Sequence, residues 1–129
     1  MKKKVGKKMK IYDYDNIFAK ILKAEISCKK IDENENTLAF LDINPLAPIH
    51  ILIIPKKPYI NFYDFNKNAS SNEILDFWKL MNFIIETKNI ENSGFRIITN
   101  SGKDGNQDVP HFHVHLLGGK NLGKMISLS

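Results

Sequence analysis

Three of the four histidines in this 129-residue chain occupy every second position of one short segment, "HFHVH". They are His111, His113 and His115, and the fourth is His50. Side chains two residues apart point to the same face of a β-strand. The three imidazoles are therefore expected to form a row, with Phe112, Val114 and Leu116 turned to the opposite side and into a core. A neutral imidazole near physiological pH can act as a nucleophile, a proton carrier or a metal ligand.

Three interpretations of this row remain open on the residues alone. Imidazoles at this spacing can ligate zinc or copper, but three along one strand converge on a single ion only where the strand bends. The histidines can also be partly exposed on an edge strand without any chemical role. In the third interpretation, one histidine attacks phosphorus while its neighbours fix its tautomer and supply a proton to the leaving group.

The histidines must be positioned by the other helices and strands of the chain. The order of these elements and the short turns between the strands predict an antiparallel α+β fold with helices on one side of the sheet. Apolar spacing predicts a short helix within 15–26 and a long helix over 74–88, preceded by a capping box at Ser70 and Glu73. The apolar face expected on the long helix is Ile74, Leu75, Phe77, Trp78, Met81, Ile84 and Ile85. Extended segments are expected as a hairpin over 28–42, a buried strand over 50–55, a strand over 95–100 and the histidine strand. Residues 59–69 and 101–108 are predicted to be loops.

Composition and charge exclude several classes of protein. The formal net charge is +5, but six lysines stand among the first ten residues, and without them the remaining chain has a net charge of −1. We therefore expect a flexible basic tail over 1–12, one domain over 13–129, and no nucleic-acid partner. The single cysteine, Cys28, excludes an intramolecular disulfide and fits a reducing compartment. With neither a signal-peptide h-region nor an apolar run of roughly 18 residues, the sequence predicts a cytoplasmic protein without a membrane partner.

The histidine row stands within a longer pattern. The segments "FAKILKAEI", "LAFLDINPLAPIHILIIPKK" and "FRIITNSGKDGNQDVPHFHVHLLGG" resemble the histidine triad superfamily of nucleotide hydrolases and transferases, and within it the Hint branch of purine nucleoside phosphoramidases. The resemblance extends over 16–119. It implies a histidine triad fold with a five-stranded antiparallel sheet and two helices, the sheet being continuous across a homodimer.

The resemblance also implies an activity, namely hydrolysis of nucleoside 5′-phosphoramidates such as AMP–amine conjugates. The reaction would pass through a nucleotidyl-histidine and need neither a metal nor another cofactor. Purine nucleotide conjugates would be the ligands. Two alternatives remain: a dinucleoside polyphosphate hydrolase, as in the fragile histidine triad branch, and a nucleotide-binding regulator with vestigial activity.

Roles for individual residues follow from the same resemblance. His113 matches the nucleophile, whose Nδ1 proton the carbonyl of His111 would hold; His115 matches a contact to the phosphate or leaving atom, and His50 a supporting histidine. Asp42 matches the residue that binds the ribose hydroxyls. The slot around the base would be formed by Ile17, Phe18, Ile21, Phe40 and Ile43. The positions implied on the phosphate side are Asn100, Gln107, Asp108 and Val109.

Two departures from the animal enzymes of the branch bear on the leaving group. Asp108 stands where those enzymes have a serine, and an ionised carboxylate there repels phosphate. The C-terminal segment "KNLGKMISLS" lacks the tryptophan-bearing end of those enzymes. The preferred leaving group is therefore left open by the resemblance.

Overall fold

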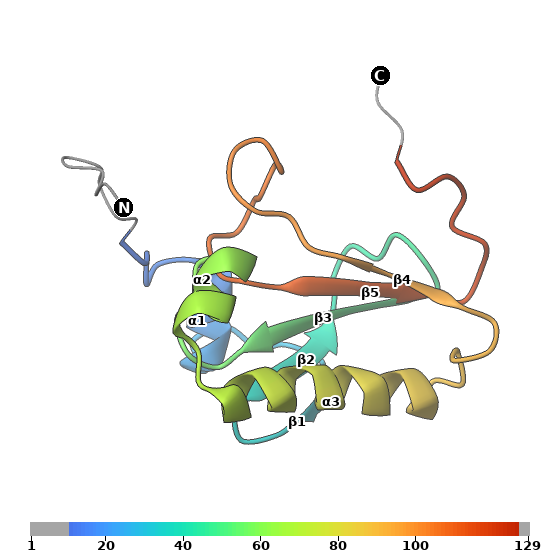
Figure 1. The fold of residues 1–129 in the computed structure, drawn as a ribbon, viewed down its shortest axis with the longest axis horizontal. Coiled ribbons are helices and arrows are strands. Elements are labelled where there is room, and N and C mark those ends of the chain that lie inside the picture. Colours follow the sequence, from blue (N-terminus) through green and yellow to red (C-terminus); the bar gives the residue numbers. More distant parts are fainter. Residues whose placement is uncertain (1–10, 127–129) are drawn as a thin grey trace, which may run out of the picture.

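The computed structural model of the protein describes residues 11–126. Five antiparallel strands form one open sheet in the order β1-β2-β3-β5-β4 (Figure 1). The strands are β1 (Lys30–Glu33), β2 (Thr37–Leu41), β3 (Ile49–Pro55), β4 (Phe95–Ile98) and β5 (Val114–Gly118). The helices are α1 (Ile17–Leu22), α2 (Phe62–Asn68) and α3 (Ser71–Thr87). The predicted α+β class and the five-stranded antiparallel sheet are confirmed, with three helices rather than two.

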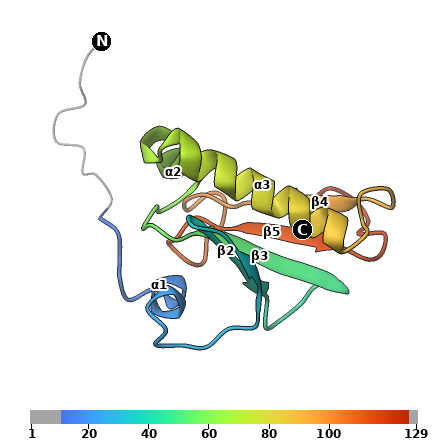
Figure 2. The same cartoon turned by 90° about the horizontal axis from the view of Figure 1, so that it is seen from below.

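Helices lie on both faces of the sheet, so the prediction that they share one side is wrong. Figure 2 shows α2 and α3 above the sheet and α1 below it. Alternate residues of β3 supply the two layers: Ile51 and Ile53 belong to the core under α3, whereas Leu52 and Ile54 pack with Phe18 of α1. Because β3 is covered on both faces, its apolar run is continuous rather than alternating, as the sequence predicted.

The segment 59–69, predicted to be a loop, contains the short helix α2. Asn61 caps this helix by accepting a hydrogen bond from the amide of Asp64 at 2.9 Å. Phe65 is its buried residue, and its ring stacks on that of Phe112 with centroids 4.9 Å apart. The cap and the buried ring of Phe65 stabilise the segment as a helix against Phe112.

The long helix α3 begins at the predicted capping box. The Ser70 hydroxyl accepts from the amide of Glu73, and the Glu73 carboxylate accepts from the amide of Ser70. Most of the predicted apolar face lies in the core, but Leu75 and Trp78 are 54% and 38% exposed. Leu75 and Trp78 are three residues apart and lie on the side of the helix that points away from the sheet. The buried face of the helix includes Leu80 in their place.

Two expectations concern residues elsewhere in the chain. The predicted basic tail lies largely in residues 1–10, which are outside the residues that the structure describes. The tail therefore stays a prediction. Within residues 11–126, no helix has the combined length and apolar character that a membrane crossing requires.

Candidate active site

The histidine segment begins before β5 and is held by hydrogen bonds of backbone and side-chain groups, among them that from the amide of Phe112 to the carbonyl of Tyr59 at 2.7 Å. The regular strand starts only at Val114, later than predicted. Nε2 of His111 donates to the carbonyl oxygen of Pro55 at 2.9 Å, and the Thr99 hydroxyl donates to the carbonyl oxygen of His113 at 2.8 Å. The predicted alternation is confirmed, since Phe112, Val114 and Leu116 all lie in the core.

The tautomer of His113 is set by its own chain. Nδ1 of His113 lies 2.7 Å from the carbonyl oxygen of His111. A carbonyl oxygen can only accept, so Nδ1 carries the proton and Nε2 of the neutral ring keeps its lone pair. The ring is buried, and the edge-on ring of Phe18 lies 4.9 Å away, centroid to centroid. His113 therefore has the proton arrangement of a nitrogen nucleophile.

His50 and His115 form a second hydrogen-bonded unit. The amide of Leu46 donates to Nδ1 of His50 at 3.0 Å, so the proton of neutral His50 is on Nε2. That Nε2 lies 2.9 Å from Nδ1 of His115, which must accept. The proton of neutral His115 is consequently on its Nε2. The ring centroids of His113 and His115 are 5.2 Å apart, so a hydrogen-bond donor stands next to the ring of His113.

Burial keeps these supporting imidazoles neutral. Desolvation is the main cause that lowers the pKa of His111 to about 4. It also lowers the pKa of His115 to about 4, with further contributions from His113 and His50. For His50, desolvation lowers the pKa although the carboxylate of Asp42 opposes it. At neutral pH these three residues act as hydrogen-bonding groups rather than cations.

The zinc interpretation can be tested on one cluster. Ligating atoms of Asp42, His50 and His115 lie within 4.8 Å of one another. A zinc-bound histidine needs a proton on its other ring nitrogen, which it donates to a partner. Nδ1 of His50 instead accepts from the Leu46 amide, so zinc at Nε2 would require an anionic imidazolate. The donor set therefore fits a hydrogen-bonded chain and does not fit a zinc site.

Of the residues expected around a base, Phe18 contacts the ring of His113, and the five residues differ in exposure. Phe18 and Phe40 are buried with edge-on rings 5.7 Å apart, centroid to centroid. Ile21 is half-buried against the same cluster, whereas Ile17 and Ile43 are 42% and 84% exposed. Oδ2 of Asp42 lies 3.4 Å from Nε2 of His50, and Oδ1 of Asp42 accepts a hydrogen bond from the amide of Asn44.

The loop on the other side of His113 is braced by Gln107. Its amide oxygen accepts from the amide of Gly102, and its nitrogen donates to the carbonyls of Ile60 and Val109. In this structure the Gln107 amide thus shapes the loop. Asn100, which precedes the loop, is half-buried.

Asp108 places a carboxylate near His113. Its side chain is 81% exposed, and its Oδ1 lies 3.7 Å from Nε2 of His113. The same oxygen accepts from the amide of Val109. A carboxylate at this distance favours a cationic group, and disfavours an anionic one, near Nε2.

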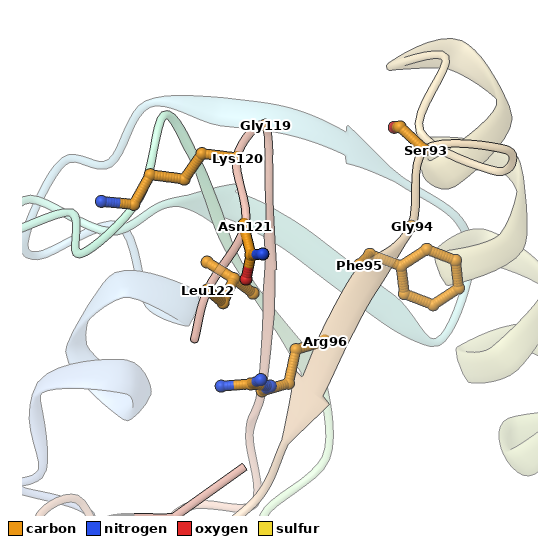
Figure 3. A pocket seen from close by; sticks show the side chains of 8 residues that line it. All are labelled: Ser93, Gly94, Phe95, Arg96, Gly119, Lys120, Asn121 and Leu122. Atoms are coloured by element: carbon orange, nitrogen blue, oxygen red, sulfur yellow. The ribbon is translucent and has the colours of Figure 1, made fainter. Parts of the chain in front are cut away.

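A cavity of about 480 Å³ lies between the start of β4 and the segment that follows β5 (Figure 3). None of the histidines lines it. The Arg96 guanidinium, on the side of β4 opposite to Phe95, donates to the carbonyls of Gly123 and Lys124. The hydrogen bonds of Arg96 thus hold the C-terminal segment in place. Because no histidine lines this cavity, the histidine cluster remains the candidate site.

Comparison with known proteins decides the family. A family model described as the HIT domain matches residues 23–122. The chain belongs to the HIT family. Within this family, an uncharacterized HIT-like protein of Azospirillum brasilense is 46% identical over 92% of this chain and 97% of its own. The region that the family model matches contains all four histidines and begins after α1.

Solved HIT structures have the same fold. A HIT family hydrolase from Legionella pneumophila superposes with a TM-score of 0.78 at 35% identity, over 84% of this chain and 96% of its own. A histidine triad nucleotide-binding protein from Candida albicans superposes with a TM-score of 0.72 at 28% identity, over 89% of this chain and 86% of its own. Membership of the HIT family, with its hydrolases, supports a hydrolase class for this chain.

Two residues that support the site escaped the sequence analysis. Thr99 holds the carbonyl of His113, and the Tyr12 hydroxyl is hydrogen-bonded to Nδ1 of His111, 99 positions away. Neither contact has a local sequence signal, because each depends on tertiary packing. Cys28 is half-buried, and desolvation raises the pKa of its thiol, which makes it a poor nucleophile.

Proposed function

We propose that this HIT protein hydrolyses nucleoside 5′-phosphoramidates through a covalent nucleotidyl intermediate on Nε2 of His113. The observation that carries the proposal is the 2.7 Å hydrogen bond from Nδ1 of His113 to the carbonyl of His111. It leaves the Nε2 lone pair for attack and stabilises the positive charge that the ring acquires when Nε2 bonds to phosphorus.

The proposed reaction has two steps. Nε2 of His113 forms a bond to the α-phosphorus while the bond from phosphorus to the amine nitrogen breaks, and the departing nitrogen takes up one proton to leave as the amine. Water then forms the new P–O bond, the P–Nε2 bond breaks, and one proton is released with the nucleoside monophosphate. The Nε2–H of His115 stabilises negative charge on the phosphoryl group or leaving atom by hydrogen bonding.

The nucleoside would lie beside His113, between Asp42 and α1. The carboxylate of Asp42 offers acceptors for two ribose hydroxyls. Phe18 and Phe40 would form the floor of the base slot, with Ile17, Ile21 and Ile43 along its sides. The exposed positions of Ile17 and Ile43 suit contact with a ligand, since a purine would cover apolar surface there. Asn100, Gln107 and Val109 would border the phosphate.

Asp108 favours amine leaving groups over nucleotides. A dinucleoside polyphosphate releases an anionic nucleotide, whereas a phosphoramidate releases an amine. Because the Asp108 carboxylate lies 3.7 Å from Nε2 of His113, it repels the additional phosphates of the first substrate more strongly. The polyphosphate hydrolase is therefore the less favoured of the two reactions.

We also propose a homodimer that extends the sheet through β4. β4 is the last strand of the sheet and exposes Phe95 and Ile97, each 41% accessible. An edge strand with exposed apolar residues is a template for pairing with a second copy. The presence of a single cysteine, Cys28, as a free thiol supports the proposal that the protein works in a reducing compartment, the cytoplasm.

The test is amine release from an adenosine 5′-phosphoramidate, run beside diadenosine triphosphate as substrate, with wild type and His113→Ala. Rapid amine release by wild type, loss in the variant, and no effect of a chelator are expected. Faster cleavage of diadenosine triphosphate would replace the proposed reaction by its rival. Turnover of neither substrate, with retained nucleotide binding, would favour a regulator.

A further inference from the structure

The position of Tyr12 is fixed by the residue that caps α1. Asn16 is 6% exposed, and its side-chain oxygen accepts from the amide of Ala19 at 2.9 Å. Its side-chain nitrogen donates to the carbonyl of Asp13 at 2.7 Å. The cap therefore folds the chain immediately after Tyr12 into a turn anchored to the helix, which directs Tyr12 toward the histidine segment.

Tyr12 contacts the ring nitrogen of His111 that does not bond to the carbonyl of Pro55. The Tyr12 hydroxyl is hydrogen-bonded to Nδ1 of His111, and the two rings lie edge-on with centroids 5.5 Å apart. His111 is 0% exposed, and its Nε2 must donate to the carbonyl of Pro55. In the neutral ring Nδ1 must then accept, and the hydroxyl donates. Burial raises the pKa of Tyr12, so the phenol keeps the proton that it donates.

We propose that Tyr12 is a positioning residue for the catalytic histidine, acting through His111. Its hydroxyl donates to Nδ1 of His111 while the carbonyl of Pro55 accepts from Nε2, and these two bonds hold the ring between Tyr12 and Pro55. The backbone carbonyl of that same residue accepts Nδ1–H of His113. Two side-chain bonds of His111 thus hold the carbonyl that selects the reactive tautomer of His113.

Without the hydroxyl, the carbonyl of Pro55 still keeps the proton of neutral His111 on Nε2, and Nδ1 becomes a buried acceptor that has lost its donor. A proton on Nδ1 alone would leave the Nε2 lone pair facing the Pro55 carbonyl, and protons on both nitrogens would place a cation in a buried site. The ring must move or admit water, and its carbonyl moves with it. Substrate contacts lie elsewhere, so the chemical step is affected more than binding. Only this kinetic consequence rests on the proposed function.

The experiment compares wild type with Tyr12→Phe, which keeps the ring and removes only the hydroxyl. Tyr14→Phe is the matched control, because the Tyr14 ring packs edge-on against Tyr12 at 4.8 Å and is 58% exposed. Imidazole ¹⁵N NMR of the full chain reports which nitrogen of each histidine carries the proton. Steady-state kinetics with an adenosine 5′-phosphoramidate separates kcat from KM.

In Tyr12→Phe we expect altered nitrogen shifts at His111 and His113, kcat lowered about tenfold, the factor associated with one buried hydrogen bond, and an unchanged KM. Tyr14→Phe should match wild type. Unchanged histidine shifts would overturn the inference, even if the melting temperature falls, because Tyr12 would then only pack. An unchanged kcat in an active enzyme would also overturn it. If wild type lacks phosphoramidase activity, the proposed function fails, while the NMR comparison still decides the role of Tyr12.

Discussion

The Thr99 hydroxyl donates to the carbonyl oxygen of His113 across 2.8 Å, where no strand pairing holds that carbonyl. Thr99→Val keeps the shape of the side chain and removes this donor. We expect about 1 kcal/mol less stability, as for one hydrogen bond, and a lower kcat because His113 loses part of its support. Denaturant unfolding and amine-release kinetics measure the two effects.

Thr87→Val is the matched control for this experiment. The Thr87 hydroxyl also donates to a backbone carbonyl, that of Phe83, at 2.8 Å, but on the exposed end of α3. The control should keep the wild-type kcat. An equal fall of kcat in both variants would mean that Thr99 supports the fold in general and not His113.

A second prediction concerns the charge beside the nucleophile. Asp108→Asn keeps the size of the side chain and removes the carboxylate 3.7 Å from Nε2 of His113. The ratio of kcat/KM for diadenosine triphosphate to that for the phosphoramidate should rise about two- to fivefold, as for one exposed charge pair, and the effect should shrink in high salt. Asp104→Asn, in the same loop, is the control. An unchanged ratio would remove Asp108 from the control of leaving-group preference.

Stability should fall between neutral pH and pH 5. The pKa of His111 and that of His115 are about 4 in the folded protein, below the ordinary value of 6.5. The unfolded chain therefore binds more protons as the pH falls through 6.5, and stability is lost progressively until about pH 4. For His111 alone, the loss is about 2 kcal/mol by pH 5 and about 3 kcal/mol by pH 4.

Denaturant unfolding at several pH values between 7.5 and 5 measures this loss. The window lies above the ordinary carboxylate pKa values, so histidines dominate it. His111→Gln should show a shallower dependence than wild type. A stability that is flat over this window in wild type would contradict buried neutral histidines.

The sequence was informative where periodicity and burial act together. Alternation in "HFHVH" correctly placed Phe112 and Val114 in the core, since a period of two leaves one choice of face. On α3 the pattern was broader than the buried face, because Leu75 and Trp78 are apolar yet exposed. Periodicity identifies a helix but does not say where its apolar stripe ends.

What could not be predicted depends on contacts between distant segments. Short segments such as 62–68 have too few residues for a clear helical period, and α2 was missed for that reason despite the capping Asn61. The contact of Tyr12 with His111 joins residues 99 positions apart. The hydrogen bond from the Gln107 amide to the carbonyl of Ile60 likewise joins distant segments, and it forms only when the loop is folded.

The proposed dimer can be tested at the sheet edge. Ile97 is 41% exposed on β4, and it pairs with Leu116, so it shares the face covered by α3. Ile97→Lys should shift the molecular mass measured by light scattering from dimer to monomer, because a lysine on an edge strand opposes pairing. Ile26→Lys, at a 38% exposed isoleucine beyond α1, should remain a dimer. A monomeric wild type would contradict the proposed assembly.

The central claim is that Nε2 of His113 becomes bonded to phosphorus during turnover. Mixing the protein with an adenosine 5′-phosphoramidate, quenching in alkali within the first turnover and measuring the intact mass tests it directly, since a phosphorus–imidazole bond survives alkali and is lost in acid. We predict a protein heavier by one adenylyl group, with the group on His113, and no such species in His113→Ala. Amine release without the adduct in wild type, or with the adduct on another residue, would contradict the account.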